Sequence, residues 1–170
     1  MQWMELVRTR RAWGAGAMAI AVLVICAQLF AAQGAGTEPK KSFLNPAGLS
    51  TPRGYTHVVS VEGGRTVFIA GQVSLNAKGE LIGKGDLRAQ ATQVYENLKT
   101  ALAAVGATPA DVVKLNTYVV NLNPEALATV REVRGRAFPQ QNPPASTLVG
   151  VTALANPDFL IEIEAIAVIR

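Results

Sequence analysis

The chain has 170 residues and a formal net charge of +4, from 16 Lys and Arg against 12 Asp and Glu. This length suits one modest domain, and a composition of 49% hydrophobic and 16% charged residues excludes a disordered or collagen-like chain. Because the sequence holds one Cys and one His, it also excludes a disulfide framework and a Cys/His zinc site. We therefore expect no bound metal, and no motif calls for a cofactor.

Residues 1–34 have the layout of a signal peptide. Arginines between residues 8 and 11 precede an uncharged stretch that is almost wholly apolar over residues 17–32, and small residues follow it. The pair Arg10-Arg11 looks like part of a twin-arginine export signal. We therefore expect an exported protein, periplasmic or secreted, with no membrane contact after cleavage. An uncleaved membrane anchor stays open as an alternative, and a lipoprotein anchor at Cys26 is a weaker one.

The next segment, residues 35–53, carries several prolines and shows no helical period. These features predict a linker and an irregular arm, followed by one domain over residues 54–170. Two alternating, β-branched runs open that domain, at Thr56–Val61 and Thr66–Val73. The turn between them contains two glycines, which predicts a hairpin of two paired antiparallel strands.

The rest of the domain alternates helices and strands. Apolar residues recur at three- and four-residue steps from Leu87 to Val105, which predicts a helix with one buried face. A strand at Val112–Val120, a second helix from Pro124 to about Phe138, and strands at Thr147–Thr152 and Phe159–Ile169 follow. The order β-β-α-β-α-β-β predicts an α+β fold with both helices on one face of a mixed sheet.

The last predicted strand has no face suited to solvent. One of its two rows is wholly apolar, and the other mixes Glu162 and Glu164 with Leu160, Ile166 and Val168. A monomer would expose this second row as an apolar patch. We therefore expect a homo-oligomer whose subunit contact contains a polar cleft.

Six short sequence motifs occur along residues 54–170 in a specific order and spacing. They are Gly54-Tyr55-Thr56, Ala70-Gly71-Gln72, Glu96-Asn97-Leu98, Asp111-Val112-Val113-Lys114, Pro143-Pro144-Ala145 and the run from Ile161 to Ala167. Together they resemble the RidA/YjgF family of small trimeric proteins, many of which hydrolyse reactive enamines and imines to keto acids and ammonia. The resemblance implies a chorismate-mutase-like fold, a homotrimer with a barrel-like core, and small-molecule sites in the clefts between subunits.

The resemblance also implies which residues form the site. Tyr55 matches the family's cleft tyrosine, Gly71 the residue whose backbone lines the substrate pocket, and Glu162 the acidic residue that positions water. A carboxylate beside a bound water is a sufficient general acid and base for imine hydrolysis. Glu162 and Tyr55 are thus the predicted catalytic residues, and Gly71 is predicted to bind substrate. In a structural alternative, Glu162 and Glu164 simply pair with cations across the subunit interface.

The chain departs from the family pattern at the substrate anchor. Catalytic members follow Pro-Ala with an arginine that grips the substrate carboxylate through two parallel hydrogen bonds, and this chain has Ser146 there. The family's cleft cysteine falls on Leu148, so Ser146 and Leu148 are predicted to line a more neutral pocket. Arg131 falls on an asparagine of the pattern. It is predicted either to supply a substitute anion contact or to be a surface charge.

These observations predict a divergent RidA-like hydrolase, a deaminase of enamines, imines or related small molecules. The absent arginine motivates an alternative, a non-catalytic trimer that binds a small molecule or a partner protein in the same clefts. No basic stripe alternates with aromatics outside residues 1–34, so we expect no nucleic-acid partner. A Ser–His catalytic pair would need Ser74 or Ser146 beside His57, a geometry that the sequence does not show.

Overall fold

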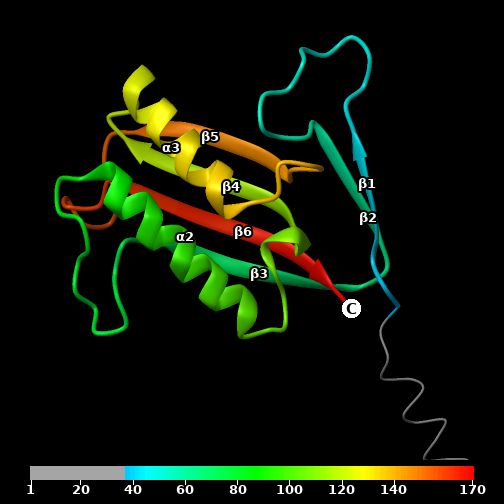
Figure 1. Cartoon of the computed structure of the whole chain (residues 1–170), viewed down its shortest axis with the longest axis horizontal. Helices are drawn as coiled ribbons and strands as arrows, with labels where there is room; N and C mark the ends of the chain where they lie inside the picture. The colour runs from blue at the N-terminus through cyan, green and yellow to red at the C-terminus, as the bar shows by residue number, and fades with distance from the viewer. Residues whose placement is uncertain (1–36) are drawn as a thin grey trace, which may run out of the picture. The chain divides into compact units, whose positions relative to one another are not determined.

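The computed structural model describes residues 37–170 (Figure 1). The predicted signal peptide, twin-arginine pair and Cys26 lie outside the described residues. The elements are β1 (Lys40–Leu44), β2 (Val58–Glu62), β3 (Arg65–Gln72), α2 (Leu87–Ala103), the 3-10 turn η1 (Pro109–Asp111), β4 (Val112–Val120), α3 (Pro124–Ala137), β5 (Ala145–Val151) and β6 (Ile161–Ile169).

The main sheet has four strands in the order β3-β6-β4-β5. Strands β4 and β5 run parallel, whereas β6 is antiparallel to both of its neighbours. Helices α2 and α3 lie side by side on one face of this sheet (Figure 1). Between them and the sheet lies a core that includes Leu98 of α2, Leu115 of β4 and Ile161 of β6, each at most 1% exposed. The predicted α+β fold with helices on one face of a mixed sheet is confirmed.

The predicted irregular arm contains a strand. Strand β1 pairs with β2 in antiparallel register, from Lys40 opposite Glu62 to Leu44 opposite Val58, so the described residues hold six strands rather than the predicted five. The prolines that suggested an irregular arm flank β1 and do not interrupt it. The backbone donors that a strand needs are therefore present along its whole length.

The predicted pairing of the first two strands is wrong, although the turn between them forms. Gly63 and Gly64 have φ values of 74° and 77°, which favour glycine. The strands on either side of the turn belong to different sheets, because β2 pairs with β1 and β3 pairs with β6. Pairing with β6 packs Val67 and Ile69 of β3 against the core, and a local hairpin would not provide that burial.

Helix α3 positions much of the candidate site. Asn123 caps its first turn by accepting a hydrogen bond of 2.9 Å from the backbone of Ala126, and Pro124 occupies the first turn, where its missing donor is tolerated. Val130 and Val133 are buried under the helix. Residues three apart share a helix face, so Arg131 and Arg134 leave α3 on the same side.

Candidate functional site

The structure divides the six predicted site residues between two faces of the main sheet. Four of them line one cavity of about 460 Å³ on the side covered by α3: Tyr55, Arg131, Ser146 and Leu148. Glu162 projects from the other face of β6, because Ile161 and Ile163 on either side of it are fully buried toward the helices. Gly71 lies beside Glu162 on that open face.

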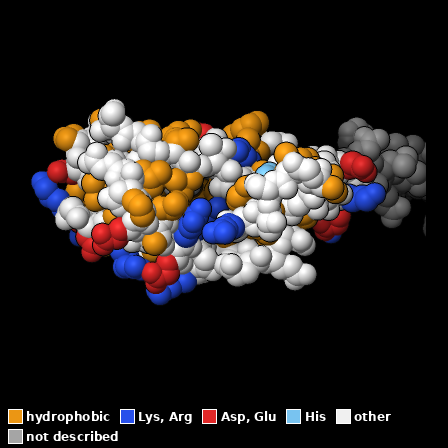
Figure 2. Space-filling model, turned by 90° about the horizontal axis from the view of Figure 1, so that it is seen from above, with side chains coloured by type: hydrophobic (Ala, Val, Ile, Leu, Met, Phe, Trp, Pro, Cys, Tyr) orange, Lys and Arg blue, Asp and Glu red, His pale blue; other side chains and the backbone are white. Residues whose placement is uncertain are grey.

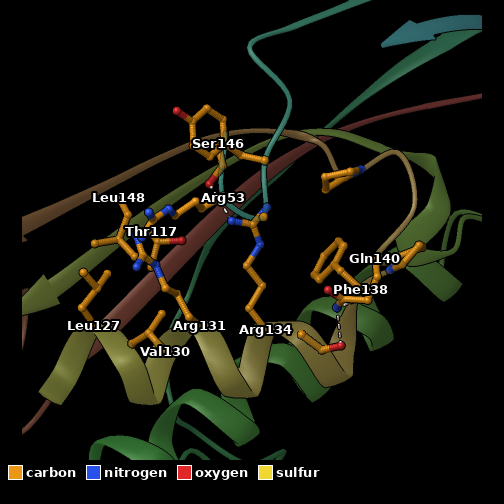
Figure 3. A pocket seen from close by; sticks show the side chains of 15 residues that line it. Arg53, Thr117, Leu127, Val130, Arg131, Arg134, Phe138, Gln140, Ser146 and Leu148 are labelled. Atoms are coloured by element: carbon orange, nitrogen blue, oxygen red, sulfur yellow. Dashed lines mark hydrogen bonds between the residues drawn. The ribbon is translucent and has the colours of Figure 1, made fainter. Parts of the chain in front are cut away.

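The cavity lies between α3, the edge strand β5 and the loop that carries Arg53 and Tyr55 (Figure 3). Its walls are partly apolar, from Leu127, Val130, Phe138 and Leu148 among others. Polar groups enter from Ser146, from the buried Thr117 of β4 and from three arginines. This volume and this mix of an apolar lining with a few polar groups are typical of a small-molecule site.

Arg134 is a cavity residue that sequence reasoning missed. Its Nη1 donates a hydrogen bond of 3.1 Å to Ser146 Oγ (Figure 3), and its Nη2 is buried with no hydrogen-bond partner among the described residues. Burial lowers the pKa of the Arg134 guanidinium from its ordinary value. The signal available in the sequence was its spacing of three residues from Arg131, which places both on one side of a helix.

On the open face, Gly71 and Glu162 are packed against each other. A Cβ at position 71 would collide with the carboxylate of Glu162, so any larger residue there would displace that carboxylate, although the backbone angle does not favour glycine. Glu162 is half-buried, and no hydrogen bond or ion pair holds its side chain within residues 37–170. The sequence motifs assigned both residues to one site, and the structure places them in contact.

Glu164, two residues further along β6, has partners within the sheet. Its Oε1 accepts hydrogen bonds from Asn116 Nδ2 at 2.6 Å and from the Tyr118 hydroxyl at 3.0 Å. The hydrogen bond to Glu164 raises the pKa of Tyr118 from its ordinary value, and the charge of Glu162 adds to the effect. Of the two carboxylates on this face, Glu162 is therefore the one without a hydrogen-bond partner among residues 37–170.

The Ser–His pair does not form. His57 Nε2 lies 2.7 Å from the carbonyl oxygen of Ser50. Ser74 donates to the carbonyl of Ile82 at 2.7 Å, and Ser146 is bonded to Arg134. His57 thus has a local structural contact and activates neither serine.

Residues 37–170 contain neither a candidate metal site nor a candidate membrane-spanning helix. No three His, Cys, Asp or Glu side chains in this part of the chain are grouped so that they could share a metal ion. None of its helices combines the length and the apolar character needed to span a bilayer.

Comparison with known proteins agrees with this fold. The family model described as Endoribonuclease L-PSP matches residues 47–169. The 2-iminobutanoate/2-iminopropanoate deaminase of Escherichia coli K12 is 38% identical over 117 residues, which cover 67% of this chain and 88% of that protein. The chain belongs to the RidA/YjgF family.

Two solved structures of other proteins are similar to this RidA/YjgF chain. The Rid family protein YyfB from Yersinia pestis is 48% identical, with a TM-score of 0.72 over 76% of this chain and 98% of that one. TdcF of Escherichia coli, solved with bound serine, is 31% identical, with a TM-score of 0.55 over 62% of this chain and 81% of that one. The second relative therefore binds a small amino acid.

Proposed function

We propose that this protein is a RidA-like hydrolase of reactive imines and enamines, exported from the cytoplasm and active as a homotrimer. The observation that carries the proposal is the Glu162 carboxylate, which lies against Gly71 on the open sheet face and has no hydrogen bond or ion pair within residues 37–170. The deaminase name of the Escherichia coli relative supports the reaction class. The bound serine in TdcF supports a substrate related to an amino acid.

The proposed reaction needs only water and one carboxylate. Glu162 accepts a proton from water while the water oxygen bonds to the carbon of the protonated imine, which gives a neutral carbinolamine. Glu162 then returns this proton to the nitrogen and accepts the hydroxyl proton as the carbon–nitrogen bond breaks, so the carbonyl forms and ammonia leaves with that last proton as ammonium. Water and an imine are thereby converted to a ketone and ammonia, with no oxidant or metal in the balance.

A second copy of the chain would complete the site. Within one chain the sheet separates Glu162 from the cavity that holds Tyr55, Arg131 and Ser146. Strand β5, which lines the cavity, is an edge strand and can be approached from its side by another subunit. In the proposed trimer, the open face of one copy packs at the β5 edge of the next and brings Glu162 to that cavity.

The test is release of ammonia from freshly generated 2-iminopropanoate by the purified protein. We expect Glu162→Gln to lower the rate by about 100- to 10,000-fold, the usual contribution of a general acid and base. The matched control is Glu164→Gln, on the same strand and face, whose amide oxygen can still accept the bonds from Asn116 and Tyr118. Equal losses in both variants would contradict the assignment of Glu162.

The second candidate function is a non-catalytic trimer that binds its ligand in the same clefts. It is favoured by Ser146, which stands where catalytic members have their anchoring arginine. Saturable binding by the unmodified protein, without release of ammonia from any imine tested, would support this alternative over the hydrolase.

A further inference from the structure

The cavity beside α3 has an excess of positive charge. Among the residues that the structure describes, three arginines line it, Arg53, Arg131 and Arg134, and no Asp or Glu does so. Within residues 37–170, none of these three forms an ion pair, whereas Arg136 on the same helix pairs with Glu132 at 2.6 Å. Helix α3 thus presents an exposed, paired arginine on one side and unpaired arginines on the side of the cavity.

Arg134 is placed to do what the family's strand arginine does. Its Nη1 is 3.1 Å from Ser146 Oγ, so the guanidinium reaches from the helix to the strand position that lost the arginine. Its buried Nη2 has no partner within the described part of the chain. A planar guanidinium that lines a cavity suits a carboxylate, which accepts two parallel hydrogen bonds.

Arg131 enters the same cavity from α3, and Arg53 enters it from the loop between β1 and β2 (Figure 3). Lys and Arg side chains also gather near the middle of the surface seen in Figure 2, beside the segment that carries the histidine. One carboxylate cannot neutralise three guanidinium groups, and like charges gathered in a partly apolar cavity repel one another. A ligand with a second negative group relieves this repulsion.

We infer that Arg134 is the ligand's principal anchor in this protein, and that the cavity takes small molecules with two anionic groups, the second of which is bound by Arg131 and Arg53. The volume of about 460 Å³ accommodates a dicarboxylate of four or five carbons. The apolar walls contact its carbon chain. Combined with the proposed function, on which this step rests, the substrate class is the imines of dicarboxylic amino acids.

Equilibrium binding tests the inference without any catalytic step. Calorimetry with the full chain would compare 2-oxoglutarate, which has two carboxylates, with 2-oxopentanoate, which has the same number of carbons and one carboxylate. We expect 2-oxoglutarate to bind about tenfold or more tightly, as one extra charge-assisted contact provides. Phosphoenolpyruvate in parallel shows whether a phosphate also serves as the second group.

Variants then separate the three arginines. Arg134→Gln should weaken both oxo acids by about tenfold or more, and Arg131→Gln should remove mainly the preference for 2-oxoglutarate. The matched control is Arg136→Gln, on the same helix but outside the cavity, which should bind both as the unmodified protein does. Binding by Arg134→Gln at the level of Arg136→Gln, or no preference for two carboxylates, would overturn the inference.

A swap guards against a variant that merely folds poorly. Because Nη1 of Arg134 and Oγ of Ser146 are in hydrogen-bond contact, Arg134→Ser combined with Ser146→Arg returns a guanidinium to the same place from the strand. We expect this pair to recover the binding that Arg134→Ser alone loses, and no recovery would count against the anchor. Oxo-acid binding without ammonia release would contradict the hydrolase and leave the anchor standing, and ammonia release unaffected by Arg134→Gln would do the reverse.

Discussion

The two faces of the main sheet are built from alternate residues of the same strands, yet they collect opposite charges. On β6, Ile161 and Ile163 are buried toward the helices while Glu162 and Glu164 lie on the open face. On the helix side, the cavity against β5 collects arginines and no carboxylate. Strand alternation therefore places both carboxylates of β6 on the open face, whereas α3 and the loop of Arg53 bring the arginines to the helix-covered side.

One copy of the chain therefore carries the residues of the proposed site on two opposite faces of the sheet and does not bring them together. The helix-covered face is closed by α2 and α3, whereas the open face exposes Phe68 to 78% beside Ile166 and Glu164. An exposed aromatic on an apolar sheet face is typical of a contact surface. The following substitutions act on one face at a time and can break or sharpen the comparison.

The largest effect is expected from Phe68→Glu on the open face. A charge there would oppose burial against another subunit and would lie near Glu164, so we expect the proposed trimer to dissociate to monomers. Light scattering after size-exclusion chromatography measures the mass. The control is Leu49→Glu, equally a change from an exposed apolar residue, at 56% exposure in a loop outside both sheets. If Phe68→Glu keeps the mass of the unmodified protein, the open face is not part of the interface between subunits.

A smaller effect is expected from Gly71→Ala, also on the open face. The added Cβ must displace the Glu162 carboxylate, and misplacement of a reacting group by about 1 Å can cost roughly 100-fold in rate. We expect ammonia release to fall by about 10- to 100-fold, together with a loss of unfolding free energy of at most about 1 kcal/mol, because the flexible Glu162 side chain can rotate away.

Gly71→Ala carries its own internal check. In a Glu162→Ala background the collision is gone, so the same substitution should cost little stability. A cost of equal size in both backgrounds, measured by denaturant unfolding, would show that the two residues do not interact as described.

The smallest effect concerns the ion pair that ties β1 to η1. Lys41 Nζ donates to Asp111 Oδ1 at 2.9 Å with both side chains mostly buried, whereas Lys40 and Glu62 are 3.9 Å apart and exposed. We expect Lys41→Gln to lower the free energy of unfolding by about 1 kcal/mol at pH 7, and Lys40→Gln to change it by much less.

The pH dependence of this pair has a definite sign. Burial raises the pKa of the Asp111 carboxyl, but hydrogen bonds from Lys41 and Thr108 outweigh it, so the pKa is lowered below its ordinary 3.8. The stabilisation is therefore present above the unfolded pKa and is lost as the pH falls through the folded value. The difference between Lys41→Gln and the unmodified protein should be clear at pH 7 and shrink toward pH 3, as followed by denaturant unfolding. A difference that is the same at both pH values would contradict the assigned pair.

The sequence by itself determined the elements with strong periods and the family. The period of α2 and the alternation of β6 predicted both elements and their buried rows, because those rows follow from the geometry of one helix and one strand. Short motifs in order identified the RidA/YjgF family and brought Gly71 and Glu162 to one place. Local chemistry also marked the glycine turn at Gly63 and Gly64 correctly.

Only the tertiary structure decided which strands pair and which arginine reaches the cavity. The partner of β3 is β6, nearly a hundred residues away, because burial in the core outweighs a local hairpin. Arg131, Arg134 and Arg136 look alike in the sequence, but packing of Val130 and Val133 orients α3 so that Arg134 meets Ser146 and Arg136 meets Glu132. The rotation of a packed helix depends on contacts with the whole core, and such contacts are not encoded in the spacing of neighbouring residues.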